Sequence, residues 1–239
     1  MHPMEHVEIQ GPVGVLEGVI SRADFTSHGA VLCHPHPLYG GSMDDAVLAA
    51  VEDGLRPHGF SSLRFNFRGV GRSQGSFDRG EGELSDAASA LDWLQTQNQD
   101  APMCWIGGFS FGAWISMQLL MRRPEITGFL SVSPPANMYD FSFLAPCPAS
   151  GLITHGDKDD IVPRESVTEL IAKLAKQKDV IIDFQVLKGA THFYNEHLEE
   201  LEQTASDYLD RRTAEIEAAL KAEIEELEDV EEEDDGDND

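Results

Sequence analysis

The sequence is poor in basic residues, in cysteine and in long apolar runs. It contains 17 lysines and arginines against 43 aspartates and glutamates, which gives a formal net charge of -26 at pH 7. A chain this acidic repels a phosphate backbone, so nucleic acid is not an expected partner. No stretch approaches the roughly 18 consecutive apolar residues that a membrane-spanning helix needs. We therefore expect no membrane partner either.

The three cysteines, Cys33, Cys104 and Cys147, lie in apolar or proline-rich surroundings and show no pairing pattern. A small, odd number of cysteines is typical of a reducing compartment. The first six residues lack the basic start and apolar run of a signal peptide. These features predict a cytoplasmic protein, and 239 residues are enough for one sizeable hydrophobic core.

Short apolar runs alternate with segments of helical periodicity along most of the chain. A hairpin is expected over residues 7–20, followed by strands at 30–33, 60–67, 102–106, 128–132, 150–155 and 180–187. Helices are expected at 46–55, 84–94, 113–121, 163–176 and 195–212. This alternation predicts an α/β fold with a doubly wound, mostly parallel sheet. Only residues 133–149 separate two of the strands, so no large lid domain is expected.

The C-terminal segment, residues 213–239, differs in composition from the rest of the chain and is predicted to lie outside the folded domain of residues 1–212. From Ala214 onward, 14 acidic residues accompany one basic residue, Lys221. Acidic runs are usually disordered. A narrow apolar stripe at coiled-coil spacing nevertheless runs through this tail, over Ile216, Leu220, Ile224, Leu227 and Val230. Two interpretations stay open: a solvated extension, or a helix for homo-oligomer formation or for docking of a protein partner.

The segment Gly107–Gly112 lies between a short apolar run and a helical segment. Within it, Gly108, Ser110 and Gly112 form the pattern G-x-S-x-G. A strand, this pattern and a helix in succession are typical of a nucleophile elbow, a turn so tight that only minimal side chains fit two positions before and after the serine. The pattern predicts that Ser110 is a nucleophile at the positive end of the following helix.

A serine nucleophile needs a base and an acid that orients the base, and in this kind of sheet the expected chain order is Ser, then Asp or Glu, then His. Three aspartates follow the strand that ends at residue 155. We assign the acid to Asp159, because Asp157 is better suited to shape the turn and Asp160 to face solvent or cap the helix. Only His192 and His197 follow this acid. His192 lies in a strand-to-helix loop and is the predicted base, whereas His197 is expected to be exposed on the closing helix.

Acyl transfer also needs two N–H donors for the oxyanion. One is the amide of Phe111, the residue after the nucleophile. The other is expected in the loop after the strand at 30–33, where two prolines have no N–H to offer. In this loop His36 is favoured, and Leu38 and Tyr39 are the alternatives.

The spacing His34-x-His36, with Asp44 and Asp45 beyond it, could also suggest a zinc site. The intervening prolines and the lack of a closely following histidine or glutamate motif disfavour this interpretation. The glycine-rich segment 66–71 lacks the Lys-Ser/Thr ending of a phosphate-binding loop. Neither a metal nor a cofactor is therefore expected.

Taken together, these motifs resemble those of the small, capless bacterial α/β-hydrolases, which are distant relatives of dienelactone hydrolase with serine in place of its cysteine nucleophile. The resemblance covers about residues 5–212 and is carried by the runs L-C-H-P-H-P-L-Y-G-G-S-M (32–43), R-F-N-F-R-G-V-G-R-S (64–73), G-G-F-S-F-G (107–112), H-G-D-K-D-D-I-V-P (155–163) and G-A-T-H-F (189–193). It implies the α/β-hydrolase fold, a triad of Ser110, Asp159 and His192, and carboxylesterase or thioesterase activity.

The predicted function is that of a cofactor-free serine hydrolase that cleaves small, partly apolar acyl esters or thioesters through an acyl-enzyme. The expected substrate-binding residues, which are equally compatible with ordinary core packing, are Leu38, Tyr39, Met138, Tyr139 and Phe193. The acidity of the chain disfavours strongly anionic substrates such as coenzyme A thioesters, although Arg68 and Arg72 could offset it.

Two alternatives stay open. The same triad could serve a peptidase, which would need a gating domain or an amine-binding site that the sequence does not reveal. The fold could also be a non-catalytic scaffold that binds a partner through the C-terminal tail. The intact order of serine, aspartate and histidine argues against this second alternative.

Overall fold

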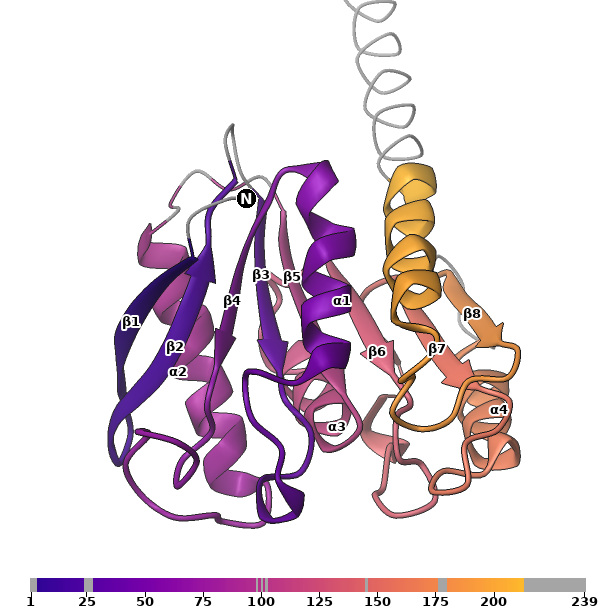
Figure 1. Cartoon of the computed structure of the whole chain (residues 1–239), viewed down its shortest axis with the longest axis horizontal. Helices are drawn as coiled ribbons and strands as arrows, with labels where there is room; N and C mark the ends of the chain where they lie inside the picture. The colour runs from indigo at the N-terminus through magenta and orange to yellow at the C-terminus, as the bar shows by residue number, and fades with distance from the viewer. Residues whose placement is uncertain are drawn as a thin grey trace, which may run out of the picture.

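An eight-stranded sheet forms the centre of the molecule, with the strand order β1-β2-β4-β3-β5-β6-β7-β8 (Figure 1). The computed structural model describes residues 4–23, 28–97, 99, 101, 103–144, 146–175 and 180–212. The strands are β1 (Met4–Gly11), β2 (Gly14–Ser21), β3 (His28–Cys33), β4 (Phe60–Phe65), β5 (Cys104–Phe109), β6 (Gly128–Val132), β7 (Gly151–Gly156) and β8 (Ile182–Leu187). Strand β2 pairs antiparallel with both β1 and β4, and every later pair in the sheet is parallel.

Helices cover both faces of this sheet (Figure 1). They are α1 (Ala46–Leu55), α2 (Glu81–Gln97), α3 (Phe111–Leu120) and α4 (Arg164–Leu174), and residues 198–212 are helical as well. Apolar side chains of α1 and of the helix at 198–212 pack on one face, and those of α2, α3 and α4 on the other. The predicted α/β architecture with a doubly wound, mostly parallel sheet is confirmed.

Most predicted elements occur where the apolar periodicity placed them, and the differences lie at their ends. The helix at 46–55 and the strand at 128–132 have the predicted bounds. Strand β5 starts two residues later than predicted and continues through Gly107 and Gly108, which the sequence placed in the elbow turn. Both glycines pair with residues of β3, and both pair with residues of β6 on the other side. Pairing on two sides outweighs the low strand propensity of glycine.

The central strands are buried on both faces, as expected for parallel strands covered by helices. All six residues of β4, β5 and β7 are buried. The parallel strands all end at the same edge of the sheet, so the loops that follow β3, β5, β7 and β8 meet there. These four loops carry the predicted oxyanion donors, the nucleophile, the acid and the base.

The connection from β6 to β7 contains no separate lid. Among the described residues of 133–150, the regular structure is the 3₁₀ turn η3 (Ser142–Leu144). In the part of the chain that the structure describes, no helix is both long enough and apolar enough to span a membrane. The predicted acidic tail at 213–239 lies outside the described residues.

Candidate active site

Ser110 lies between β5 and α3 with backbone angles of φ 53° and ψ -118°. A positive φ is unfavourable for a residue with a side chain and costs on the order of 1–3 kcal/mol. The turn is held by the Ser110 amide, which donates to the carbonyl oxygen of Val132 at 2.9 Å. A Cβ at Gly108 would overlap the backbone of Gly112, and a Cβ at Gly112 would overlap the carbonyl of Cys33. The glycines of the predicted elbow are therefore required by backbone packing.

The structure brings together the three residues predicted to form a triad. Nε2 of His192 lies 3.1 Å from Oγ of Ser110. Nδ1 of the same ring lies 2.7 Å from Oδ2 of Asp159. The serine and the histidine are 9% and 3% exposed, so solvent competes little for these hydrogen bonds. The tautomer with Nδ1–H donating to Asp159 leaves Nε2 free to accept from the serine hydroxyl.

The loop that carries His192 is anchored by its neighbour Tyr194. The Tyr194 side chain is fully buried, and its hydroxyl lies 3.1 Å from the hydroxyl of Ser133 at the end of β6. Burial raises the pKa of Tyr194 to about 12. The phenol therefore stays neutral, and its hydrogen bond fixes the position of the loop relative to the sheet.

The carboxylate of Asp159 is surrounded by donors. Its Oδ1 accepts from the amides of Ile161 at 3.0 Å and Val162 at 2.8 Å. Burial raises the pKa of Asp159, but the hydrogen bonds from His192 and from these amides outweigh burial and hold the pKa below its ordinary value. The group is therefore ionised at neutral pH, as an acid that orients an imidazole must be.

The neighbouring aspartates lie elsewhere. Oδ1 of Asp157 accepts from the amide of Gly189, which ties the loop after β7 to the loop after β8. Asp160 is exposed. The alternative base, His197, donates its amide to the carbonyl of Tyr194 and lies just before the helix at 198–212. The prediction that His197 is exposed on the closing helix is wrong, because that helix starts later and the residue is half-buried.

A second histidine beside Asp159 was missed by the sequence analysis. Nδ1 of His155 lies 3.8 Å from Oδ2 of Asp159, and the His155 side chain is fully buried. Neither ring nitrogen has a hydrogen-bond partner among the described residues. Burial lowers the pKa of His155. His155 is the penultimate residue of β7 and lies four positions before Asp159 in the sequence, and nothing in that spacing alone predicts that the two side chains lie close together.

Phe111 and His36, whose amides are the predicted oxyanion donors, line the same cavity as Ser110. Neither amide donates a hydrogen bond to another residue in the part of the chain described by the structure. The other amides considered for the second oxyanion donor are occupied. The Leu38 amide donates to Nδ1 of His36 at 3.2 Å, and the Tyr39 amide donates to the carbonyl of His36 at 3.0 Å. Of the three alternatives in this loop, His36 has the free N–H.

A cavity of about 450 Å³ opens above Ser110 and His192. Four of the five predicted substrate-binding residues line it: Tyr39, Met138, Tyr139 and Phe193. Leu38 does not, and its side chain is 67% exposed. It occupies the middle of the 3₁₀ turn η1 (Pro37–Tyr39), in which consecutive side chains point about 120° apart, so Leu38 and Tyr39 face different directions.

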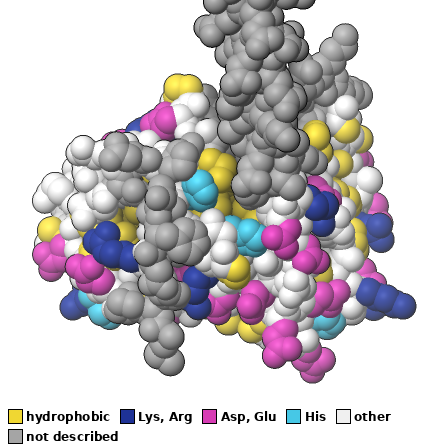
Figure 2. Space-filling model, turned by 90° about the horizontal axis from the view of Figure 1, so that it is seen from above, with side chains coloured by type: hydrophobic (Ala, Val, Ile, Leu, Met, Phe, Trp, Pro, Cys, Tyr) yellow, Lys and Arg dark blue, Asp and Glu magenta, His cyan; other side chains and the backbone are white. Residues whose placement is uncertain are grey.

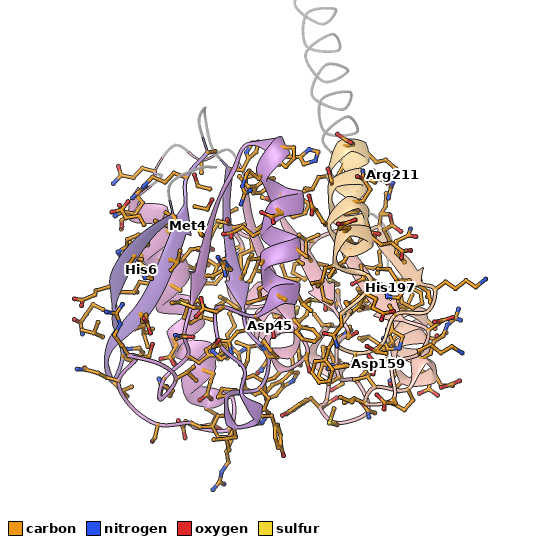
Figure 3. The ribbon with its side chains drawn as sticks, in the orientation of Figure 1. Met4, His6, Asp45, Asp159, His197 and Arg211 are labelled. Atoms are coloured by element: carbon orange, nitrogen blue, oxygen red, sulfur yellow. The ribbon has the colours of Figure 1, made fainter. Side chains whose placement is uncertain are left out.

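Asp45 is a cavity residue that the sequence analysis considered only as a metal ligand. Figure 3 shows Asp45 at the lower end of α1 and Asp159 in the loop after β7, both toward the end of the sheet where the parallel strands finish. The described residues contain no group of three or more histidine, cysteine or acidic side chains that could hold a metal ion. His34 is engaged otherwise, because its Nε2 accepts from the Phe67 amide at 3.0 Å and its Nδ1 lies 2.6 Å from the Pro35 carbonyl oxygen.

The loop between β3 and α1 is held from beneath by a buried polar network. The backbone carbonyl of Met43 accepts from Nη1 of Arg64 at 2.7 Å, and its amide donates to Oδ1 of Asn66 at 2.8 Å. The Arg64 guanidinium in turn pairs with Glu52 of α1 at 3.0 Å. Both side chains of this pair are buried. The network fixes the loop that presents His36 to the cavity.

Neither Arg68 nor Arg72 lines the cavity, contrary to the suggestion that they could offset the acidity of the chain near the substrate. Arg68 is buried and makes two hydrogen bonds to the carboxylate of Asp86, at 2.8 and 2.9 Å. Arg72 pairs with Glu17 at 2.8 Å. Figure 2 shows the opposite end of the molecule, where acidic side chains are spread over the surface with basic ones among them. The two arginines therefore pair with carboxylates of the fold and contribute no charge to the cavity lining.

Comparisons with known proteins agree with this fold. A crystal structure from Agrobacterium tumefaciens, of a protein of unknown function proposed to be an alpha/beta hydrolase, is 51% identical and superposes with a TM-score of 0.85, covering 88% of this chain and 97% of that one. An a/b serine hydrolase without lid from Xanthomonas campestris is 31% identical with a TM-score of 0.79, covering 87% and 94% of the two chains. The chain belongs to the lidless α/β serine hydrolases.

Two further matches fit this family. An uncharacterized protein of Rickettsia prowazekii (strain Madrid E) is 48% identical over 211 residues, which cover 86% of this hydrolase and 89% of the relative. Residues 30–145 match the family model described as X-Pro dipeptidyl-peptidase (S15 family). That range contains the elbow with Ser110 and the loop with His36. The more specific resemblance to dienelactone hydrolase stays a prediction.

Proposed function

We propose that this hydrolase cleaves small, partly apolar acyl esters or thioesters through an acyl-enzyme intermediate. The observation that supports this most directly is the hydrogen-bonded chain from Ser110 through His192 to Asp159 at the floor of a cavity of about 450 Å³. The aromatic and thioether lining suits an apolar acyl or leaving group. The lack of a lid favours short groups, because a long lipid chain needs a deep tunnel for its desolvation.

The proposed chemistry assigns one role to each group. His192 Nε2 takes the proton of Ser110 as its Oγ bonds to the carbonyl carbon of the substrate. The negative charge then develops on the carbonyl oxygen, where the amides of Phe111 and His36 would stabilise it, each contributing about 10²–10³ in rate. Collapse of this intermediate breaks the C–O or C–S bond, and His192 returns the proton to the leaving alcohol or thiol. A water molecule repeats the sequence and releases the carboxylic acid.

Asp159 would hold the imidazole in the required tautomer and stabilise the imidazolium that forms. The Asp159 carboxylate is buried and already ionised before the reaction, so it can orient His192 without first losing a proton. No step requires a metal or an organic cofactor.

The experiment that tests this function compares the wild-type protein with Ser110→Ala. A fluorophosphonate probe is expected to label only the wild type, and a panel of p-nitrophenyl esters and acyl thioesters is expected to lose about 10⁴ in kcat with the variant. Circular dichroism establishes that both proteins are folded. A folded wild type that is not labelled would refute the proposal and favour a non-catalytic scaffold.

A peptidase activity is the second candidate, because residues 30–145 match the model of an X-Pro dipeptidyl-peptidase family. The same triad could attack an amide. Hydrolysis of an X-Pro p-nitroanilide at a rate comparable to that of the esters, lost in Ser110→Ala, would favour the peptidase. Cleavage of the esters alone would favour the esterase or thioesterase.

A further inference from the structure

Asp45 contributes the acidic side chain of the cavity in which the proposed triad lies. The other ionisable groups among the lining residues are His36, His192 and the phenols of Tyr39 and Tyr139. No lysine or arginine of the described chain is among the lining residues. A ligand in this cavity therefore meets a carboxylate with no lysine or arginine beside it.

The position of Asp45 is fixed by the start of α1. It is the N-cap of this helix, and its Oδ1 accepts from the amide of Val47 at 2.9 Å. The helix end carries about half a positive charge, which reduces the field of the carboxylate without cancelling it. Burial raises the pKa of Asp45, while hydrogen bonds from the amides of Val47 and Leu48 and the charge on His192 act in the opposite direction. Asp45 and His192 line the same cavity.

The remaining lining of the cavity also suits a cation. Tyr39, Tyr139 and Phe193 place aromatic rings around it, and the Tyr139 ring is stacked on Trp114 at 4.3 Å. The faces of aromatic rings attract ammonium groups, most strongly where water is excluded. Since Arg68 and Arg72 are paired with Asp86 and Glu17, they do not oppose this preference.

We propose that Asp45 makes this hydrolase selective for esters or thioesters that carry a cationic group near the scissile bond, on the acyl side or on the leaving group. The inference rests on the proposed function, because it names the substrate class of the same site. Asp45 would act as a specificity-determining residue that contacts the substrate cation, in addition to capping α1.

The test uses pairs of substrates that differ only in charge. On the acyl side, the p-nitrophenyl ester of 4-(trimethylammonio)butyrate is compared with that of 5,5-dimethylhexanoate, in which a tert-butyl group replaces the trimethylammonio group. On the leaving-group side, butyrylcholine is compared with 3,3-dimethylbutyl butyrate. The measurements are made at pH 8, so that Asp45 is ionised.

For each pair, the readout is kcat/KM for the cationic substrate divided by kcat/KM for the neutral substrate. Because this ratio is compared between the wild type and each variant, the intrinsic reactivity of the substrates cancels. Asp45→Asn keeps an oxygen that can cap the helix and removes the charge. It is expected to lower this ratio about tenfold for at least one pair of substrates. A tenfold effect is the size expected when a carboxylate and a cation interact across partly screening solvent. Asp44→Asn, which makes the same change in an exposed neighbour outside the cavity lining, is expected to keep the wild-type ratio.

The pair that responds identifies the side of the scissile bond that the cation occupies. An unchanged ratio for both pairs in folded Asp45→Asn would overturn the inference while leaving the esterase intact. If the wild type cleaves neither the cationic nor the neutral member of any pair, the proposed function itself has failed. Should Asp45→Asn not fold, Asp45→Ser, which also retains a capping oxygen, replaces it.

Discussion

Gly112 packs directly against the carbonyl oxygen of Cys33. The contact joins the first turn of α3, two residues after Ser110, to the end of β3, where the loop with His36 begins. It sets the spacing between the proposed nucleophile and the proposed oxyanion donors, because neither backbone can approach the other more closely. A side chain at position 112 would separate the two halves of the site.

Gly112→Ala is expected to lower the free energy of unfolding by about 2–3 kcal/mol or to prevent folding, because the new methyl group overlaps a backbone atom that cannot rotate away. Urea unfolding followed by circular dichroism measures the change. Gly29→Ala is the matched control on β3, since a Cβ there would make only ordinary contact with Leu94 at 3.4 Å. Equal effects of the two substitutions would contradict the proposed steric role of Gly112.

Asp159→Asn is expected to lower kcat for ester hydrolysis about 10³–10⁴-fold, because an amide cannot stabilise the imidazolium and can favour the wrong tautomer of His192. The measurement is steady-state hydrolysis of a p-nitrophenyl ester by folded protein. Asp160→Asn makes the same change at the exposed neighbouring position and is expected to stay within about twofold of the wild type. A larger loss in Asp160→Asn than in Asp159→Asn would refute the assignment of the acid.

His34 is expected to make the stability of the fold depend on pH in the acid range. Burial, reinforced by the charge on His36 and opposed by the bond to Pro35, lowers the pKa of His34 to about 4. The unfolded value is about 6.5, so the unfolded chain binds the extra proton first. Stability is complete above pH 6.5 and falls by up to about 3 kcal/mol as the pH drops to 4.

The structural reason is that Nε2 of neutral His34 accepts from the Phe67 amide, which a protonated ring cannot do. Urea unfolding of His34→Gln at pH 7.5 and pH 4.5 is expected to show a smaller loss of stability than the wild type. His6→Gln, which removes an exposed histidine on β1 (labelled in Figure 3), is the control. If His34→Gln loses as much stability on acidification as His6→Gln, the assignment of the titrating group is wrong.

Much of the fold could be predicted from local patterns in the sequence. The apolar periodicity of 46–55 and the apolar run 128–132 gave the bounds of α1 and β6 because each pattern reports one buried face or one buried strand. The predicted positions of the ends of β5 and β8 were less accurate. Strand β8, predicted from residue 180, begins at Ile182, since the length of a strand depends on where its neighbour pairs with it.

The pattern G-x-S-x-G and the order of Ser110, Asp159 and His192 were available from the sequence alone, because they follow from the steric limits of a strand-to-helix turn and from the order of loops at one edge of a parallel sheet. The tertiary structure decided what depends on contacts between distant segments. Arg68 is neutralised by Asp86, 18 residues away, and Arg72 by Glu17, 55 residues away. It also decided that Asp45 lines the cavity and that Leu38 does not. Local periodicity records which side of an element is buried, but it does not record which polar group on another element lies opposite.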